Sequence, residues 1–189
     1  MRWPAKAAVK RAYKALIIPL LWGFLLLLSV GTAIGDGIET AGDALQFALP
    51  AAGAALVFAH GDFQGGLEFA ESVGLTLGVT YALKYTVPET RPNGGGQSFP
   101  SAHTSLSFSS AEFMRKRYGW EYGAPAYAAA TFVAYSRVEN GDHHPNDVIA
   151  GAAIGFLSSY LFTKPYKGWH IEVDAEPKHF YGLRLSHSL

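Results

Sequence analysis

The chain has 189 residues, of which 49% are hydrophobic and only 16% are charged, so it contains enough apolar material for one packed domain. Its formal net charge is zero, which gives neither the basic excess that indicates nucleic-acid binding nor the acidic excess of a disordered chain. The absence of cysteine excludes disulfides, zinc–thiolate sites and thiol nucleophiles.

The first predicted element is the uncharged stretch 15–35. A helix of this length, at about 1.5 Å per residue, covers the roughly 30 Å hydrocarbon core of a bilayer. The small residues Gly31 and Ala33 would also suit cleavage of a signal peptide. We favour a retained membrane span, with residues 1–35 as a separate N-terminal region. Five basic residues precede it: Arg2, Lys6, Lys10, Arg11 and Lys14.

Five further apolar runs are predicted to be helices, because they are rich in Ala, Gly and Leu and lack sustained alternation. Polar or glycine-rich turns separate them, including the acidic segment 36–43. The runs are 44–59, 67–85, 101–114, 122–135 and 148–163. The fold class expected is therefore all-α, a six-helix transmembrane bundle.

The chain is expected to have a core at 36–165 and a tail at 166–189. The end of the tail alternates apolar and polar residues, but a single short run without a partner does not predict a sheet.

Basic residues predict how such a bundle would be oriented. If all six helices span and the N-terminus is cytoplasmic, ten of the fifteen Lys and Arg residues fall in three inner segments. These are the segment before Ala15, the run 115–117, and Lys164 with Lys167. We therefore expect a multi-pass protein of the cell inner membrane. The helix ends opposite these basic segments are expected to face the periplasm or the exterior. A periplasmic protein released by signal cleavage is the alternative.

Three sequence blocks carry side chains suited to phosphate chemistry: KYTVPETRP, PSAH and SRVENGDHHPND. In an up-and-down bundle, the helix ends that hold them meet at one face. Arginine forks and lysine ammonium groups suit the oxygens of a phosphate dianion. The residues concerned are Lys84, Arg91, Ser101, His103, Arg137, His143 and Asp147.

The position of each residue suggests what it does. Ser101 precedes a helix, where its hydroxyl and the free backbone N–H groups can receive an anion. Asp147 follows His143 by four residues and can hold one imidazole nitrogen, which leaves the other as a nucleophile. His103, from a different loop, can then protonate the leaving oxygen.

These blocks resemble the signature of the type 2 phosphatidic acid phosphatase superfamily, which also includes vanadium haloperoxidases and bacterial acid phosphatases. The resemblance covers 84–147 and implies no metal and no cofactor. It implies that His143 is phosphorylated, that Asp147 orients it, and that His103 is the general acid and later activates water. The phosphoryl oxygens would be held by Lys84, Arg91, Ser101, Arg137 and the backbone N–H of Ala102.

Two features depart from the pattern of that superfamily. Ala102 stands where glycine is usual, and its methyl group would narrow the approach to phosphate. The connection from Pro92 to Pro100 is short, so little chain remains to form a lid.

The function expected is metal-independent hydrolysis of phosphate monoesters or pyrophosphates of membrane lipids through a phosphohistidine intermediate. Phosphatidic acid, phosphatidylglycerol phosphate and polyprenyl pyrophosphate are all candidate substrates. The bilayer and the phosphorylated lipid are the expected partners, and no nucleic acid is expected. Alternatives are a secreted soluble acid phosphatase, a vanadate-dependent haloperoxidase, and a protein that binds lipid phosphate without turnover. A metal site at His143 and His144 is disfavoured, because no further close His or Cys completes one.

Overall fold

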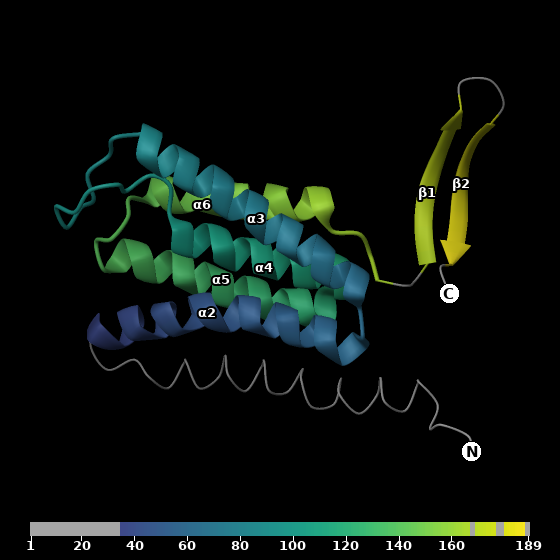
Figure 1. Cartoon of the computed structure of the whole chain (residues 1–189), viewed down its shortest axis with the longest axis horizontal. Helices are drawn as coiled ribbons and strands as arrows, with labels where there is room; N and C mark the ends of the chain where they lie inside the picture. Colours follow the sequence, from purple (N-terminus) through teal and green to yellow (C-terminus); the bar gives the residue numbers. More distant parts are fainter. Residues whose placement is uncertain (1–34, 167–168, 177–179, 188–189) are drawn as a thin grey trace, which may run out of the picture.

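A computed structural model describes residues 35–166, 169–176 and 180–187 (Figure 1). The helix predicted at 15–35 lies outside these residues, so the count of six helices stays a prediction. The described elements are the helices α2 (Gly35–His60), α3 (Phe63–Thr86), α4 (Ala102–Tyr118), α5 (Trp120–Glu139) and α6 (Pro145–Phe162), and the strands β1 (Trp169–Glu176) and β2 (Phe180–His187).

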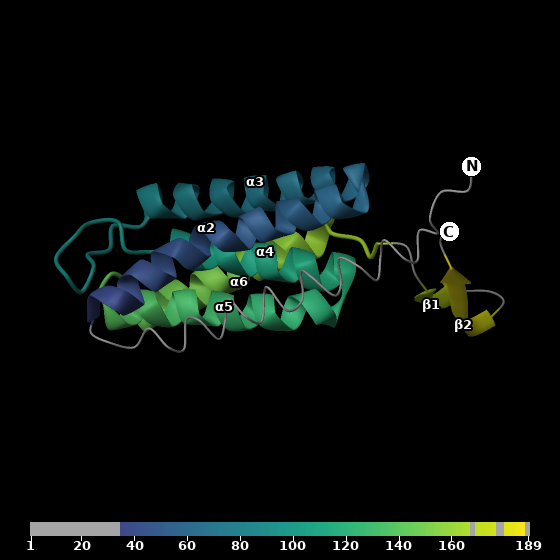
Figure 2. The ribbon, with the colours of Figure 1, turned by 90° about the horizontal axis from the view of Figure 1, so that it is seen from below.

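Successive helices run in opposite directions, and α4 lies at the centre of the bundle (Figures 1 and 2). Helix α4 contacts each of the other four described helices. The end of α3, the start of α4, the end of α5 and the start of α6 therefore meet at one end of the bundle, as predicted. We call this the site end. The start of α2 also lies there.

Local signals account for the helix boundaries. Ser101 caps α4, since its side chain accepts a hydrogen bond from the backbone N–H of Thr104. Helix α4 ends at Tyr118, and the next residue, Gly119, caps it with a φ of 101°, a conformation that favours glycine. Asp62 caps α3 by accepting from the N–H of Gly65 at 2.9 Å. Pro145 occupies the first turn of α6, where it lacks no needed hydrogen bond.

The prediction that 36–43 forms a turn is wrong. Helix α2 begins at Gly35, so the acidic segment forms its first turns. The segment contains no proline, and its Glu and Ala residues favour helix as readily as its Gly and Asp residues favour a turn. This longer helix carries Asp43 to the site end.

The tail contains an element that the all-α prediction lacked. Strand β1 pairs antiparallel with β2, from Trp169 opposite His187 to Glu176 opposite Phe180. The run of alternating apolar and polar residues at the end of the chain thus pairs with WHIEVDAE, in which apolar and polar residues also alternate. Each of the five described helices overlaps one of the runs predicted to be helical, so the helical part of the prediction is confirmed for these residues.

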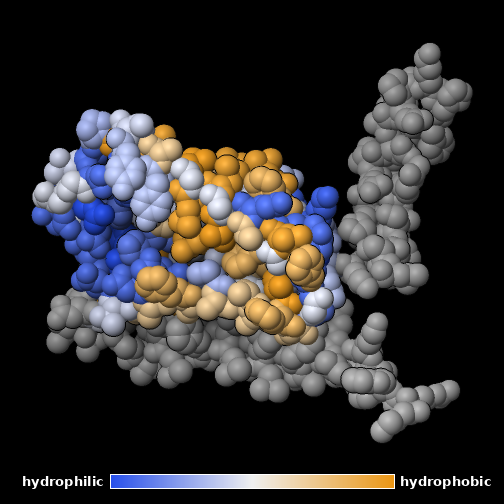
Figure 3. All heavy atoms as spheres, in the orientation of Figure 1, coloured by the Kyte–Doolittle hydropathy of each residue, from blue (hydrophilic) through white to orange (hydrophobic). Residues whose placement is uncertain are grey.

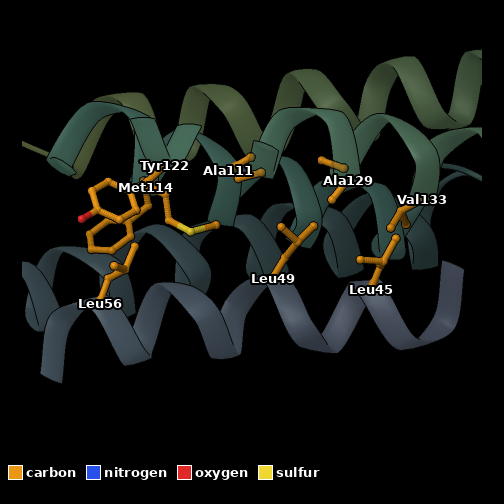
Figure 4. Close-up of a cluster of buried hydrophobic side chains, with 11 residues drawn as sticks. Leu45, Leu49, Leu56, Ala111, Met114, Tyr122, Ala129 and Val133 are labelled. Carbon is orange, nitrogen blue, oxygen red and sulfur yellow. The ribbon is translucent and has the colours of Figure 1, made fainter. Parts of the chain in front are cut away.

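The apolar core lies between α2, α4 and α5 (Figure 4). Leu45, Leu49 and Leu56 project from one face of α2 toward Met114 of α4 and Val133 of α5, and all five are buried. At roughly 1.5 to 3 kcal/mol for each large side chain removed from water, this cluster fixes α2 against the centre of the bundle.

Helices α4 and α6 pack almost backbone to backbone. A Cβ atom added at Gly151 would lie 2.5 Å from the carbonyl oxygen of Ser101, and one at Gly155 would clash with the carbonyl oxygen of Ser105. The GxxxG spacing of these glycines is what permits the close approach. It determines where the start of α4 lies relative to the start of α6.

The end opposite the site is closed by buried ion pairs. Arg117 binds the carboxylate of Asp62 through two nitrogens, at 2.6 and 2.7 Å, and that of Glu68 at 3.1 Å. Its backbone carbonyl accepts from Tyr166, and its guanidinium donates to the carbonyl of Lys164. These contacts join α4 to the start of α3 and to the segment after α6.

Candidate functional site

All three sequence blocks come together at the site end of the bundle. Each predicted residue lies in a helix terminus or an adjoining loop there, as the up-and-down path requires. Lys84 lies in the last turn of α3, Arg91 in the following loop, Ser101, Ala102 and His103 at the start of α4, Arg137 in the last turn of α5, His143 just before α6, and Asp147 in its first turn.

The carboxylate of Asp147 orients the imidazole of His143. Its Oδ2 atom lies 3.3 Å from Nδ1 of the imidazole, and it also accepts hydrogen bonds from Oγ of Ser98 and from the N–H of His144. The two side chains are 0% and 2% exposed. The backbone carbonyl of Asp147 accepts from the N–H of Ser101, which ties the start of α6 to the start of α4.

His143 is neutral in this environment. Burial, together with the positive charges of Arg91 and Lys84, lowers the pKa of its imidazole to about 4, although the hydrogen bond to Asp147 opposes the shift. Because Nδ1 faces a carboxylate, we assign its proton to that nitrogen. The lone pair on Nε2 is then available at neutral pH.

Lys84 and Arg91 provide two of the three cations. The Nζ atom of Lys84 donates to the carbonyl oxygens of Gln97 at 2.7 Å and Ser98 at 3.4 Å. Arg91 has a buried Nε atom without a hydrogen-bond partner, while its Nη1 atom lies 3.9 Å from Asp142. A buried donor without a partner costs free energy, and an anion bound here would supply its acceptor.

Arg137, the third cation, is fixed on all sides. Its Nη1 atom lies 2.9 Å from Oδ1 of Asp43 and 3.3 Å from Oδ2 of Asp142. Its Nη2 atom donates to the carbonyl of Glu39, and its Nε atom donates to Oγ of Ser136. The side chain is only 3% exposed, so its charge is held in place before any ligand binds.

The connection between α3 and α4 is anchored to the loop between α5 and α6. Asn93 donates from its backbone to Gly141 and from its side chain to Asp142, and His144 contacts the carbonyl of Thr90 at 3.1 Å. Ala102 is the first residue of α4, where the backbone angles suit any residue, so its methyl group introduces no strain.

Sequence reasoning missed three residues of this arrangement. Ser98 holds Asp147, but it lies in an irregular loop where no spacing rule identifies it. Asp142 lies within the third block, beside His143, and its carboxylate lies near Arg91 and Arg137. Its negative charge among the predicted cations is a sequence signal that could have identified it. Asp43, from α2, lies 3.7 Å from Nε2 of His103 and belongs to a segment that was assigned to a turn.

Within the side chains that the structure describes, no group of three His, Asp or Glu residues is arranged to hold a metal ion. What the site end assembles is a neutral imidazole beside three cations and a second histidine. Such a set can bind a phosphoryl group and offer it a nucleophile and an acid.

Comparison with known proteins agrees with this geometry. Residues 93–170 match the sequence model of the PAP2 superfamily. Over 104 residues the chain is 35% identical to the lipid A 1-phosphatase of Porphyromonas gingivalis, covering 51% of this chain and 23% of that protein. It is 31% identical over 116 residues to a probable diacylglycerol pyrophosphate phosphatase of Schizosaccharomyces pombe, covering 53% of this chain and 41% of the relative.

A third relative is the lipid A 4'-phosphatase of Bacteroides thetaiotaomicron, 41% identical over 73 residues, which cover 36% of this chain and 31% of that protein. The chain thus spans less than half the length of these curated relatives. Among solved structures, Aquifex aeolicus LpxE superposes with a TM-score of 0.58 and 20% identity, over 72% of this chain and 92% of that one. The two chains share a fold.

Proposed function

We propose that the chain, which matches the PAP2 superfamily model over residues 93–170, is a member of that superfamily and hydrolyses phosphate monoesters or pyrophosphates of membrane lipids without a metal ion. The observation that supports this most strongly is the neutral His143, oriented by Asp147 and facing the charges of Lys84 and Arg91. The relatives of the chain include proteins named lipid A phosphatase and probable diacylglycerol pyrophosphate phosphatase.

In the first step, Nε2 of His143 attacks phosphorus. The bond from phosphorus to the leaving oxygen breaks, and that oxygen keeps the electron pair and takes a proton from His103. The developing charge on the phosphoryl oxygens is met by Lys84, Arg91 and Arg137, whose cationic groups surround the site. The N–H of Ala102, at the positive end of α4, adds a neutral donor.

In the second step, water replaces the histidine. His103, now neutral, takes a proton from water as its oxygen attacks the phosphorus of the phosphohistidine. The P–N bond breaks, its electron pair returns to His143, and inorganic phosphate leaves. Asp147 stabilises the imidazole while it carries positive charge in both steps.

The surface of the helical body supports a membrane location. Figure 3 shows hydrophobic residues gathered over the middle of the molecule, with hydrophilic residues at the site end. Large apolar side chains point outward from several helices. Among them are Phe47, Phe58, Leu67, Tyr81, Ile149 and Leu161.

The part of the interior that lies between α3, α4 and α6 is polar. Hydroxyl side chains line the contacts of α3 and α4 with α6, where small residues let helices approach and exchange hydrogen bonds in lipid. Thr80, for example, donates to Ser105 at 3.0 Å. The fully buried hydroxyl residues include Ser72, Thr76, Thr80, Ser105, Ser107 and Ser109.

By length and composition, one described helix, over Gly37–His60, can cross a membrane. The other four described helices do not meet that criterion; α4, for example, has 17 residues. We propose a multi-pass protein of the inner membrane with the site end facing the periplasm or exterior. The basic residues 115–117 and Lys164 lie at the other end, where positive-inside charge belongs.

The test of the activity is release of inorganic phosphate by detergent-purified protein, in EDTA, from phosphatidic acid, phosphatidylglycerol phosphate and undecaprenyl pyrophosphate. We expect release from at least one lipid that is lost in His143→Ala. No release from any of them would reject the proposal. Retained lipid binding by the inactive variant would separate turnover from simple binding.

The test of the location is fractionation of cells that express the chain. We expect the protein in the membrane pellet after washing with alkaline carbonate, and activity that depends on detergent or lipid. Recovery as an active soluble protein would favour a secreted acid phosphatase instead.

A further inference from the structure

Asp43 lies outside the three sequence blocks, yet α2 brings it into the site. Gly42, one residue earlier, allows this approach. A Cβ atom there would clash with Oγ of Ser136 and lie 2.8 Å from Nη2 of Arg137. Helix α2 therefore lies directly against the end of α5, and the next side chain along it reaches the phosphate-binding residues.

The carboxylate of Asp43 contacts two functional groups at once. Its Oδ1 atom is 2.9 Å from Nη1 of Arg137 and 3.7 Å from Nε2 of His103. The Asp43 side chain is 46% exposed, whereas that of Arg137 is 3% exposed. The negative charge thus lies at the open side of the site, between the buried cation of Arg137 and the imidazole of His103.

This position bears on the leaving group. If Nε2 of His103 protonates the leaving oxygen, that oxygen must come within hydrogen-bonding distance of Nε2, and therefore close to Asp43. From a monoester, the leaving oxygen takes the proton and departs as a neutral alcohol. From a diphosphate, the group that departs after the same proton transfer is a phosphate monoester that still carries negative charge.

We propose that Asp43 is a specificity-determining residue that selects lipid phosphate monoesters over lipid diphosphates by repelling an anionic leaving group. This inference rests on the proposed function and narrows its substrate class. The charge acts through space and does not need to touch the phosphoryl group, which Arg137 and the other cations hold.

The experiment compares two lipids that share the same acyl chains, phosphatidic acid and diacylglycerol pyrophosphate. Initial rates of phosphate release give kcat/KM for each lipid in mixed micelles, for the wild-type protein and for Asp43→Asn. We expect the wild-type protein to prefer phosphatidic acid. We expect the nearly isosteric variant to shift the ratio of the two kcat/KM values toward the diphosphate by about tenfold, the scale of one nearby charge near a surface.

Glu39→Gln is the matched control. Glu39 is an exposed acidic residue one turn earlier on α2, and it contacts Arg137 through its backbone carbonyl, which the substitution keeps. This control should leave the ratio unchanged. A general loss of structure in Asp43→Asn would lower both rates together, and Asp43→Ser would then provide a second measurement of the ratio.

The outcomes separate the two proposals. A ratio that is the same in wild type, Asp43→Asn and Asp43→Ser would overturn the role of Asp43 while leaving the phosphatase activity in place. A wild-type preference for the diphosphate would overturn it as well. No release from either lipid would reject the proposed function for these substrates, and the selectivity with it.

Discussion

Nδ1 of His143 and Oδ2 of Asp147 lie 3.3 Å apart in a part of the protein that solvent hardly reaches. The same carboxylate oxygen accepts from Ser98 and from the backbone of His144, so the group that holds the imidazole is itself held. The loop before α4 and the start of α6 therefore both contribute residues that orient the imidazole of His143.

Substitution of Asp147 by Asn should reduce kcat by about 100-fold or more, because the amide stabilises the positively charged imidazole less well and can favour the wrong tautomer. KM should change little, since Asp147 does not face the phosphoryl group. Ser98→Ala removes one of the contacts to Asp147 and should cause a smaller loss. An Asp147→Asn variant that keeps most of its kcat would contradict the role given to this carboxylate.

The acid limb of kcat/KM should lie well below pH 6. His143 must be neutral to attack, and burial with Arg91 and Lys84 lowers its pKa to about 4, so the nucleophile remains available down to about that pH. Removal of one of these charges, in Arg91→Gln, should raise the pKa and move the limb upward. A pH–rate profile of both proteins, with the substrate's own titration measured separately, checks this. An acid limb at the same pH in both would contradict it.

Gly155→Ala should destabilise the protein by about 1 to 3 kcal/mol and lower its activity. The added methyl group would meet the carbonyl of Ser105, and relief of that clash moves α4, which carries Ser101 and His103. The control is Gly78→Ala in α3, where a Cβ atom has no neighbour within 4 Å and alanine favours the helix. Thermal denaturation in detergent, read beside activity, distinguishes the two. Equal stability of the two variants would contradict the close packing.

Arg117→Met should destabilise the protein by about 3 to 5 kcal/mol, because it leaves the buried carboxylates of Asp62 and Glu68 without their cation.

Burial raises the pKa of Asp62, but hydrogen bonds from Arg117 and Gly65 outweigh this and lower it overall. The stability that Asp62 contributes is therefore present above its ordinary pKa of 3.8 and is lost as the pH falls through the lowered value. Denaturation midpoints between pH 3 and 7 measure this, with Lys116→Met as the control of smaller effect.

Much of this arrangement could be predicted from sequence because its signals are local. Apolar runs end at proline or glycine, as at Gly119, and helix direction follows from the short connections. Once the direction of each helix is known, Lys84, His103, Arg137 and Asp147 must lie at the same end of the bundle.

The rest depends on contacts between distant segments. Composition leaves the start of α2 ambiguous, and packing of Leu45 against α5 decides it, so Asp43 could not be placed from its neighbours in sequence. Ser98 reaches Asp147 through a loop conformation that no periodicity describes. The hairpin depends on the pairing of β1 with β2, and the sequence of either strand alone does not predict that pairing.

In the proposed mechanism, the phosphoryl group passes through His143. The most direct measurement is to mix purified protein with a phosphorylated lipid in EDTA, quench at alkaline pH within the first turnovers, and locate the phosphoryl group by mass spectrometry of peptides. We predict phosphate on His143, absent from His143→Ala and formed slowly in His103→Ala, which lacks the acid for the first step. Turnover with no phosphorylated histidine in any of the three proteins, or phosphate on another residue, would contradict the mechanism.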